Sequence, residues 1–284
     1  MRSHIVAATL TLALAASAAG VGAQEVGFAK APPTVLGAAA VRAFVPGEVL
    51  RYEASFGPLK VGEGRLEVAG IEQVRGRPAY HLVFRIAGGV PLYRIDDLLE
   101  SWVDTATLSS LRFSKQLNEG RRQRTQRFEI FPERGVYEEE GKGTSPTVDE
   151  PLDDGAFFYF VRTLPLQTGD RYVLHRYFRP DRNPVQVTVV RRERVKVPAG
   201  EFDAIVLRPV INTTGMLSQA RRTELWVSDD DARVLVQVQS HLPFGTITLK
   251  LSSMTRGANV NPTLVPEPMT LSVAVSPFTA SRKL

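Results

Sequence analysis

The sequence predicts a mostly β protein, in which a large antiparallel sheet curls into a barrel or half-barrel and carries one short helix. Three observations support this prediction. Apolar and polar residues alternate with a period of two over much of residues 50–251, as in strands with one buried face. Turn-forming Gly, Pro, Asn and Asp residues separate these stretches, and only residues 156–164 have helical spacing. A two-sheet β-sandwich is the alternative architecture.

The first residues have the pattern of a secretory signal peptide. A basic start with Arg2 and His4 precedes an apolar run over residues 5–19. This run is short for a membrane span, and Val21 and Ala23 fit the small-residue positions that signal peptidase recognises. We therefore expect a signal peptide over residues 1–23, with an uncleaved anchor as the alternative. The protein is then exported, and is either periplasmic or secreted.

Composition divides the remaining chain into three parts. Residues 24–44 are rich in Ala, Gly and Pro, which predicts a flexible leader. Residues 45–252 are long enough for a single β-rich domain. Prolines interrupt residues 253–284, which are expected to form a poorly ordered tail. The sequence has no second long apolar stretch, so we expect no transmembrane span in the mature protein.

Alternation predicts the strands of the first half in order. Leu50, Tyr52 and Ala54 share one face of a strand at residues 50–56. The Gly57-Pro58 turn leads from it into a strand at residues 62–68, so the two form a hairpin. A turn at residues 118–120 predicts a second, longer hairpin. The remaining strands of this half are expected at residues 80–86, 99–103, 111–117, 122–131 and 136–140.

One segment breaks the strand pattern. Phe157, Phe160, Val161 and Leu164 recur at helical spacing, and Asp153 can cap such a helix by accepting hydrogen bonds from free backbone amides. We expect a short helix over residues 156–164 whose apolar stripe closes one end of the sheet. Strands then resume, and are predicted at residues 172–178, 185–197, 202–210, 221–227, 233–241 and 245–251.

Composition argues against several classes of function. The chain has 35 Lys and Arg residues against 30 Asp and Glu residues, an excess too small to indicate nucleic-acid binding. Cysteine is absent, and His81, His175 and His241 have no second ligand at metal-binding spacing, so we expect no metal site. The glycine pairs lack the third glycine of a dinucleotide-binding loop, so no cofactor is expected.

Clustered carboxylates offer the strongest enzyme alternative, because two of them could act as acid and base. Asp96, Asp97, Glu100 and Asp104 lie along one short stretch. We favour a structural interpretation, in which Asp96 and Asp97 form a turn and the other two share the solvated face of the next strand. The three aspartates at residues 229–231 are interpreted in the same way, as a hairpin tip rather than a calcium site.

The densest positive charge falls on the hairpin that turns at residues 118–120. Arg122 and Arg124 share one face of its second strand, while Arg121 and Arg127 project to the other. Guanidinium groups bind anions in pairs, so these four arginines are our candidates for binding anionic lipid, glycan or a membrane surface. We expect the hairpin to project beyond the sheet. The competing interpretation is an exposed strand edge that its charges protect from aggregation.

Several segments resemble a known family. They are Pro46-Gly47-Glu48 with Leu50-Arg51-Tyr52, the helical segment that ends in Phe-Val-Arg-Thr-Leu-Pro-Leu, Val197-Pro198-Ala199-Gly200-Glu201-Phe202, Leu225-Trp226-Val227-Ser228-Asp229-Asp230 and Pro243-Phe244-Gly245. Over residues 46–251 the chain resembles the bacterial domain-of-unknown-function family numbered 3108. The resemblance implies an exported, largely β envelope protein without catalytic residues to carry over. One departure is Gly155-Ala156, where a small polar residue is expected after the helix cap.

Two functions from different classes follow. A curled sheet has a concave face, and such faces hold lipids, glycans or partner chains. Our main prediction is therefore a non-enzymatic binding module of the cell envelope for a lipid, a glycan or an envelope partner. The alternative is a hydrolase-type enzyme that uses carboxylates or histidines gathered from several strands. An apolar concave face would favour a lipid carrier, and converging Asp, Glu and His side chains would favour an enzyme.

Overall fold

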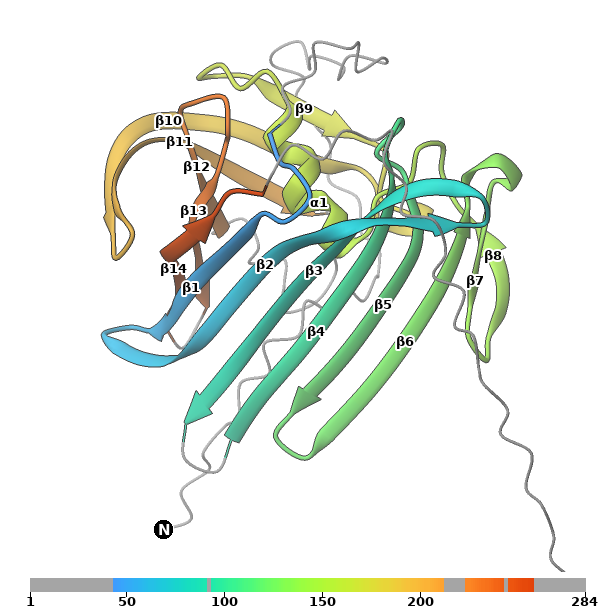
Figure 1. Cartoon of the computed structure of the whole chain (residues 1–284), viewed down its shortest axis with the longest axis horizontal. Coiled ribbons are helices and arrows are strands. Elements are labelled where there is room, and N and C mark those ends of the chain that lie inside the picture. Colours follow the sequence, from blue (N-terminus) through green and yellow to red (C-terminus); the bar gives the residue numbers. More distant parts are fainter. Residues whose placement is uncertain (1–42, 91–92, 212–222, 243–244, 258–284) are drawn as a thin grey trace, which may run out of the picture.

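A computed structural model of the chain describes residues 43–90, 93–211, 223–242 and 245–257. These residues form one antiparallel sheet of fourteen strands (Figure 1). The strands of its first half are β1 (Val49–Phe56), β2 (Leu59–Val74), β3 (Arg77–Val90), β4 (Tyr93–Asp104), β5 (Ser110–Glu119), β6 (Arg122–Phe131), β7 (Val136–Glu139) and β8 (Gly143–Pro146). Those of the second half are β9 (Arg171–Leu174), β10 (Val185–Val197), β11 (Gly200–Ile211), β12 (Thr223–Ser228), β13 (Leu235–Leu242) and β14 (Gly245–Thr255).

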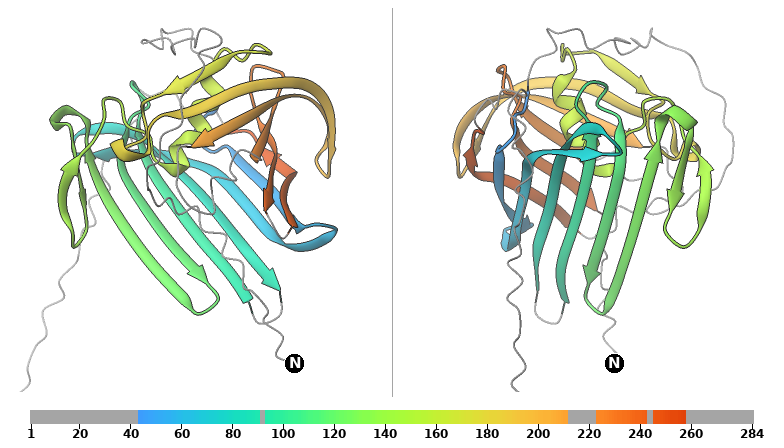
Figure 2. Two further views of the ribbon diagram at one scale, coloured as in Figure 1. Left: turned by 180° about the vertical axis from the view of Figure 1, so that it is seen from behind. Right: turned by 45° about the vertical axis from the view of Figure 1, so that its right-hand side comes forward.

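The order of the strands joins the two halves through the ends of the domain. Paired strands are consecutive in sequence except at one place, where β1 pairs with β14 from Val49↔Thr255 to Phe56↔Ile247. The outermost strands are β8 and β9. The sheet curls strongly, as Figure 2 shows from two further sides. The predicted curled sheet is therefore confirmed, and the two-sheet sandwich is not the architecture.

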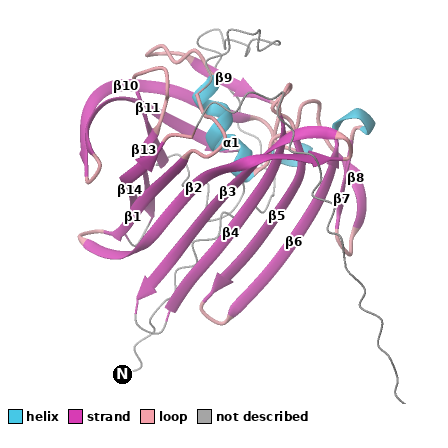
Figure 3. Cartoon of the chain, in the orientation of Figure 1, coloured by secondary structure: helices cyan, strands magenta, loops and turns pink. Residues whose placement is uncertain are grey.

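The only α-helix in the described part of the chain lies between the two halves of the sheet. The α-helix α1 (Asp154–Phe160) continues into the short 3-10 helix η2 (Val161–Thr163), and two more 3-10 turns are η1 (Pro132–Arg134) and η3 (Pro180–Arg182). Figure 3 shows α1 inside the curve of the sheet, where it contacts β3 and β4. We call the sheet face toward α1 the inner face. No helix in the described part of the chain has the length and apolar character to cross a bilayer.

The apolar stripe of the predicted helix enters the main core. Phe160, Val161 and Leu164 are buried there, and Phe157 is half-buried against it. The α-helix is shorter than the predicted span of residues 156–164, because it begins at Asp154 and becomes a 3-10 turn after Phe160. Asp153 is its N-cap, as expected, and accepts hydrogen bonds from the amides of Gly155 and Ala156.

The predicted strands are present, but several run further than predicted: β2 spans Leu59–Val74 against residues 62–68, and β4 spans Tyr93–Asp104 against residues 99–103. The short strand β8 was not predicted, since Gly143–Pro146 has no alternating apolar residues. Strand β9 ends at Leu174 rather than at residue 178. The chain beyond it leaves β10 and makes a parallel bridge between Leu152 and Tyr177 instead. This bridge brings the segments after β8 and β9, the two outermost strands, together.

The described fold is longer than the expected domain at both ends. Ala43 and Phe44, which we placed in the leader, are buried in the core. Strand β14 runs to Thr255, beyond the expected limit at residue 252. The predicted signal peptide and most of the predicted leader and tail lie outside the described residues.

Candidate binding face

The candidate arginines lie at the turn and along the free end of the β5–β6 hairpin. Arg124 pairs with Leu117 and Arg122 pairs with Glu119, so Arg122 and Arg124 share the face of Leu117. Lys115, two residues before Leu117, binds Asp154 of α1 at 3.0 Å. This contact shows that Leu117, Arg122 and Arg124 belong to the inner face of the sheet.

The other two arginines lie elsewhere on the hairpin. Arg127 projects from the outer face and pairs with Glu140 at 3.0 Å. Arg121 occupies the turn between the strands, rather than the strand face that we predicted for it. All four arginines are exposed. Within the described part of the chain, Arg121, Arg122 and Arg124 make no hydrogen bond or ion pair through their side chains.

The hairpin does not project freely, contrary to our expectation. Its turn is bonded to β4, because the Asn118 amide donates to Asp97 Oδ1 at 2.9 Å and the Gly120 amide donates to the Arg94 carbonyl at 2.7 Å. The Asn118 side chain adds a bond to the Asp96 carbonyl at 3.0 Å. The hairpin that carries the arginines is therefore hydrogen-bonded to β4 along one side.

Apolar side chains cover part of the inner face between α1 and the arginine hairpin, beside Asp97 and Lys115. Phe84 and Ile86 of β3 are half-buried against the core, as are Phe157 and Phe158 of α1. The rings of Phe84 and Phe158 lie 5.8 Å apart between their centroids. In β5, Leu117 lies on the same face opposite Arg124, but the buried carboxylate of Asp97 in β4 lies between it and Ile86. The inner face thus has an apolar part and, beyond Asp97, exposed positive charge.

A buried polar cluster surrounds the N-terminus of α1. The hydroxyl of Ser101 donates to Asp153 Oδ1 at 2.6 Å, and the Ser110 hydroxyl accepts from the Asp153 amide at 3.0 Å. Asp154 binds Lys115 at 3.0 Å and accepts from the Tyr177 hydroxyl at 2.7 Å. These contacts fix the helix to β4, β5 and the segment after β9.

The pKa values of the two aspartates in this cluster are shifted in opposite directions. Burial raises the pKa of Asp153 to about 6, although hydrogen bonds from Ser101 and Ala156 work against it. Burial also acts on Asp154, but the charge of Lys115 and the Tyr177 hydrogen bond outweigh it, and the pKa of Asp154 is lowered. Oδ2 of Asp153 has no hydrogen-bond partner among the described residues. Since Oδ1 of Asp153 caps the helix, the cluster has a structural role.

The clustered carboxylates of β4 each have their own partner. Asp96 and Asp97 lie within β4 instead of forming a turn. Asp96 binds Arg85 at 2.8 Å, which lowers the pKa of Asp96, while burial raises the pKa of Asp97. Glu100 lies 3.3 Å from Nε2 of His81. Because their partners lie on both faces of the strand, these carboxylates do not converge on one point.

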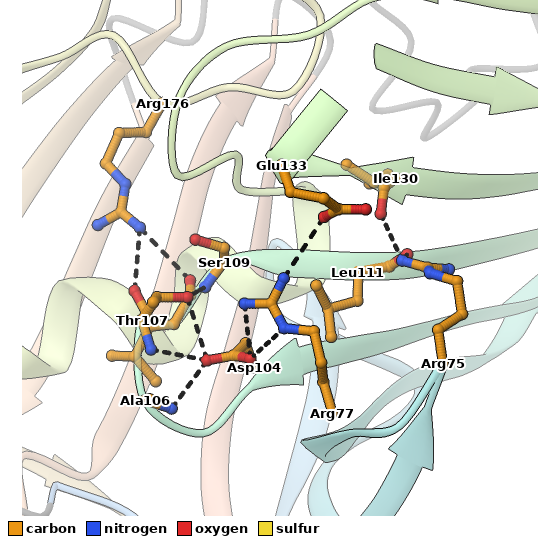
Figure 4. Close-up of polar contacts among 11 residues, drawn as sticks. Arg75, Arg77, Asp104, Ala106, Thr107, Ser109, Leu111, Ile130, Glu133 and Arg176 are labelled. Atoms are coloured by element: carbon orange, nitrogen blue, oxygen red, sulfur yellow. Dashed lines mark hydrogen bonds and ion pairs between the residues drawn. The ribbon is translucent and has the colours of Figure 1, made fainter. Parts of the chain in front are cut away.

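Asp104 is buried, contrary to the prediction of a solvated position. The chain after β4 turns back over its carboxylate, as Figure 4 shows, so Oδ1 accepts from the amides of Ala106 and Thr107 at 2.9 and 2.8 Å. Oδ2 accepts from Nε of Arg77 at 2.9 Å. Only 4% of Asp104 is exposed. This carboxylate holds a turn and leaves no oxygen for a substrate.

The three histidines lie in β3, after β9 and in β13, and none is on the arginine hairpin. His81 is stacked on Trp102 and lies 2.9 Å from Glu72 through Nδ1, with Glu100 on its other nitrogen. The two carboxylates therefore approach opposite sides of the ring. His175 and His241 are exposed. Among the residues that the structure describes, no three His, Asp or Glu side chains are grouped as a metal would require.

The three-aspartate segment forms a turn between β12 and β13. Asp230 Oδ1 accepts from the amides of Ala232 and Arg233, both at 3.1 Å, and from the Ser228 hydroxyl at 2.7 Å. Asp229 binds Arg192 at 2.7 Å. The hairpin-tip interpretation of residues 229–231 agrees with these contacts.

Comparison with solved structures finds likenesses of different strength, of which the first supports the fold. A β-barrel-like protein of unknown function from Brucella abortus, of the family DUF1849, is 11% identical, with a TM-score of 0.54 over 76% of this chain and 99% of the other. A candidate exported protein with a YmcC-like fold from Bacteroides fragilis is 11% identical, with a TM-score of 0.29 over 75% and 97% of the two chains. A candidate lipoprotein from Parabacteroides distasonis is 11% identical, with a TM-score of 0.29 over 75% and 98%.

The family comparison is more specific than these likenesses of fold. No curated protein matches the chain. A family model does match, over residues 51–252. This range includes β2 to β13 completely and most of β1 and β14. The family is described only as a protein of unknown function. The chain belongs to the family of unknown function DUF3108.

Proposed function

We propose that this chain is an exported, non-enzymatic binding module of the cell envelope that binds an anionic lipid. Export rests on the signal-peptide pattern of residues 1–23. The lipid hydrocarbon would contact the apolar part of the inner face, and the headgroup would meet the arginine hairpin. One observation carries the proposal: Arg122 and Arg124 lie on the same face of the sheet as Leu117 and that apolar part.

The chemistry of both parts suits an anionic amphiphile. The guanidinium fork matches the oxygens of a phosphate, and half-buried Phe84, Ile86 and Phe158 provide apolar contact. Each basic residue near an anionic membrane contributes about 1 kcal/mol, which salt weakens. Arg121, Arg122 and Arg124, which have no carboxylate partner among the described residues, would together support reversible attachment to a membrane surface, and Arg127 would add to it on release from Glu140.

The hydrolase alternative has less support. An acid–base pair needs two carboxylates on either side of a reacting bond. Asp96, Glu100 and Asp104 instead have separate basic or backbone partners, and Asp153 is buried as a helix cap. No observation favours a particular reaction for these groups.

Co-sedimentation with phosphatidylglycerol vesicles tests the proposal. We expect the mature protein to sediment with the vesicles at low salt and to remain in the supernatant at high salt. Replacing Arg121, Arg122, Arg124 and Arg127 by Gln should abolish sedimentation at low salt. Circular dichroism checks that this variant is folded.

A matched control changes the net charge by the same amount. Four arginines that have carboxylate partners of their own are replaced by Gln: Arg85, Arg134, Arg192 and Arg194. This control should sediment like the wild type. Equal sedimentation of wild type and hairpin variant would reject the proposal, as would equal loss in the control, because net charge alone would then explain the binding.

A further inference from the structure

Half of strand β6 forms an open edge of the described sheet. Strand β5 pairs with residues 122–129 of β6, from Arg112↔Glu129 to Glu119↔Arg122. On its other side, β7 pairs only with residues 128–131 of β6. Figure 1 shows β6 extending well beyond β7. No described strand therefore covers the far side of residues 122–126.

The orientation of the backbone groups along this edge follows from one hydrogen bond made by β6. The Glu140 amide donates to the Arg127 carbonyl at 3.0 Å, so Arg127 directs its backbone carbonyl away from β5. Successive residues of an antiparallel strand bond to opposite neighbours. Gln123 and Thr125 have the same parity as Arg127, and their amides and carbonyls therefore also point away from β5. These four groups lie in the plane of the sheet and can bond to an added strand.

A second open edge in the same protein provides a comparison. Strand β9 pairs only with Val185–Thr188 of β10, although β10 continues to Val197. The basic residues of this part of β10 have carboxylate partners within the chain: Arg191 binds Glu193 at 2.9 Å and Arg194 binds Asp203 at 3.0 Å. Charged side chains on an edge oppose unwanted strand pairing. The edge of β6 differs because Arg122 and Arg124 have no such partners among the described residues.

The charge of the β6 edge selects the kind of strand that fits it. A second copy of β6 would place arginines opposite arginines, which is unfavourable across a strand pair. An acidic strand would place carboxylates beside Arg122 and Arg124 while its backbone bonds to Gln123 and Thr125. We propose that this edge binds an extended acidic segment of a partner protein by strand addition.

This interaction goes beyond lipid binding, because it uses backbone groups of Gln123 and Thr125 that a headgroup does not require. A short synthetic peptide that alternates Glu and Thr serves as the probe. It should slow hydrogen exchange at the amides of Gln123 and Thr125, because an added strand would bond to them. A peptide with Lys in place of Glu should leave their exchange unchanged.

Substitution of Thr125 separates strand addition from simple charge attraction. Thr125→Pro removes the outward amide, and an edge position tolerates Pro because β5 does not use that amide. Thr125→Val keeps the amide and is the control. We expect Thr125→Pro to weaken peptide binding about ten-fold and Thr125→Val to bind like the wild type. Arg122→Gln with Arg124→Gln should weaken binding and remove its dependence on salt.

Two results would overturn the inference. The first is unchanged exchange of the Gln123 and Thr125 amides at saturating peptide. The second is full peptide affinity in a folded Thr125→Pro variant, which would show that only side chains attract the peptide. Phosphatidylglycerol vesicles should not protect these amides, and equal protection by vesicles would also count against strand addition. Since Thr125→Pro should still sediment with vesicles, failure here is distinguishable from failure of the lipid proposal.

Discussion

Arg162 and Glu48 form a two-bond ion pair in the core of the protein. Nη1 of Arg162 lies 2.7 Å from Glu48 Oε1, and Nη2 lies 2.9 Å from Oε2. Their side chains are only 2% and 7% exposed. Nη2 also donates to the carbonyls of Ala43 and Ala232. One guanidinium therefore joins the start of the fold, the 3-10 helix after α1 and the turn between β12 and β13.

Removing one partner of this pair should strongly destabilise the fold. Arg162→Met leaves the Glu48 carboxylate buried without its partner, which typically costs about 3–5 kcal/mol of unfolding free energy. Urea denaturation measures the loss. The double variant Arg162→Met with Glu48→Met should lose less than the single variant. A single variant that unfolds at the urea concentration of the wild type would contradict the role given to the pair.

The helix stripe leads to a second prediction about stability. Phe160→Ala should cost about 3–5 kcal/mol of unfolding free energy, because Phe160 is buried in the main core. Phe157→Ala should cost less, since Phe157 is half-buried. Both values come from chemical denaturation of the purified variants. A loss below about 1 kcal/mol for Phe160→Ala would show that this ring is not a core anchor.

Gly155 and Ser101 should be energetically coupled. A Cβ atom built on Gly155 would lie 2.5 Å from Ser101 Oγ, which explains why a larger residue does not follow Asp154. Gly155→Ala should therefore displace Ser101 and cost about 1–3 kcal/mol of unfolding free energy. Part of this loss should return in the double variant with Ser101→Ala, which removes the hydroxyl. Additive losses in a double-mutant cycle would refute the contact.

Local sequence patterns predicted most strands because burial alternates with every residue of a strand. The alternation of Leu50, Tyr52 and Ala54 is visible without any knowledge of the partner strands. The pairing of β1 with β14 is not, since it joins residues about two hundred positions apart and depends on how the whole sheet closes. Strand β8 was missed because it is short and lacks apolar residues.

Local sequence patterns also do not show which distant polar residues meet in the fold. Asp104 has the parity of a solvated position, yet the following turn folds back and buries it. The Arg162–Glu48 pair joins residues 114 positions apart. Both residues lie in segments that carry the family resemblance, but nothing in the sequence indicated that the two side chains meet. Strand parity did place Arg122 and Arg124 on one face and Arg127 on the other. It could not indicate that this face is the inner one, because that depends on the contact of Lys115 with α1.

The raised pKa of Asp153 predicts that the fold gains stability as the pH falls from about 7 to 5. Burial raises this pKa to about 6 in the folded protein, above the value for an unfolded chain, so the folded state binds the proton more tightly. Protonation near pH 6 then stabilises the fold, by an amount on the order of 2 kcal/mol. The pKa of Asp154 is lowered, so its contribution to stability is lost only when the pH falls further.

Asp153→Asn isolates this effect. Asparagine is also a good N-cap and its carbonyl can accept from the Gly155 and Ala156 amides, but it carries no charge to desolvate. We expect the variant to be at least as stable as the wild type at pH 7.5, and its unfolding free energy to change little between pH 7 and 5. Urea denaturation at several pH values measures both proteins. If the unfolding free energies of the wild type and of Asp153→Asn change by the same amount between pH 7 and 5, the buried carboxylate of Asp153 does not control the pH dependence of this fold.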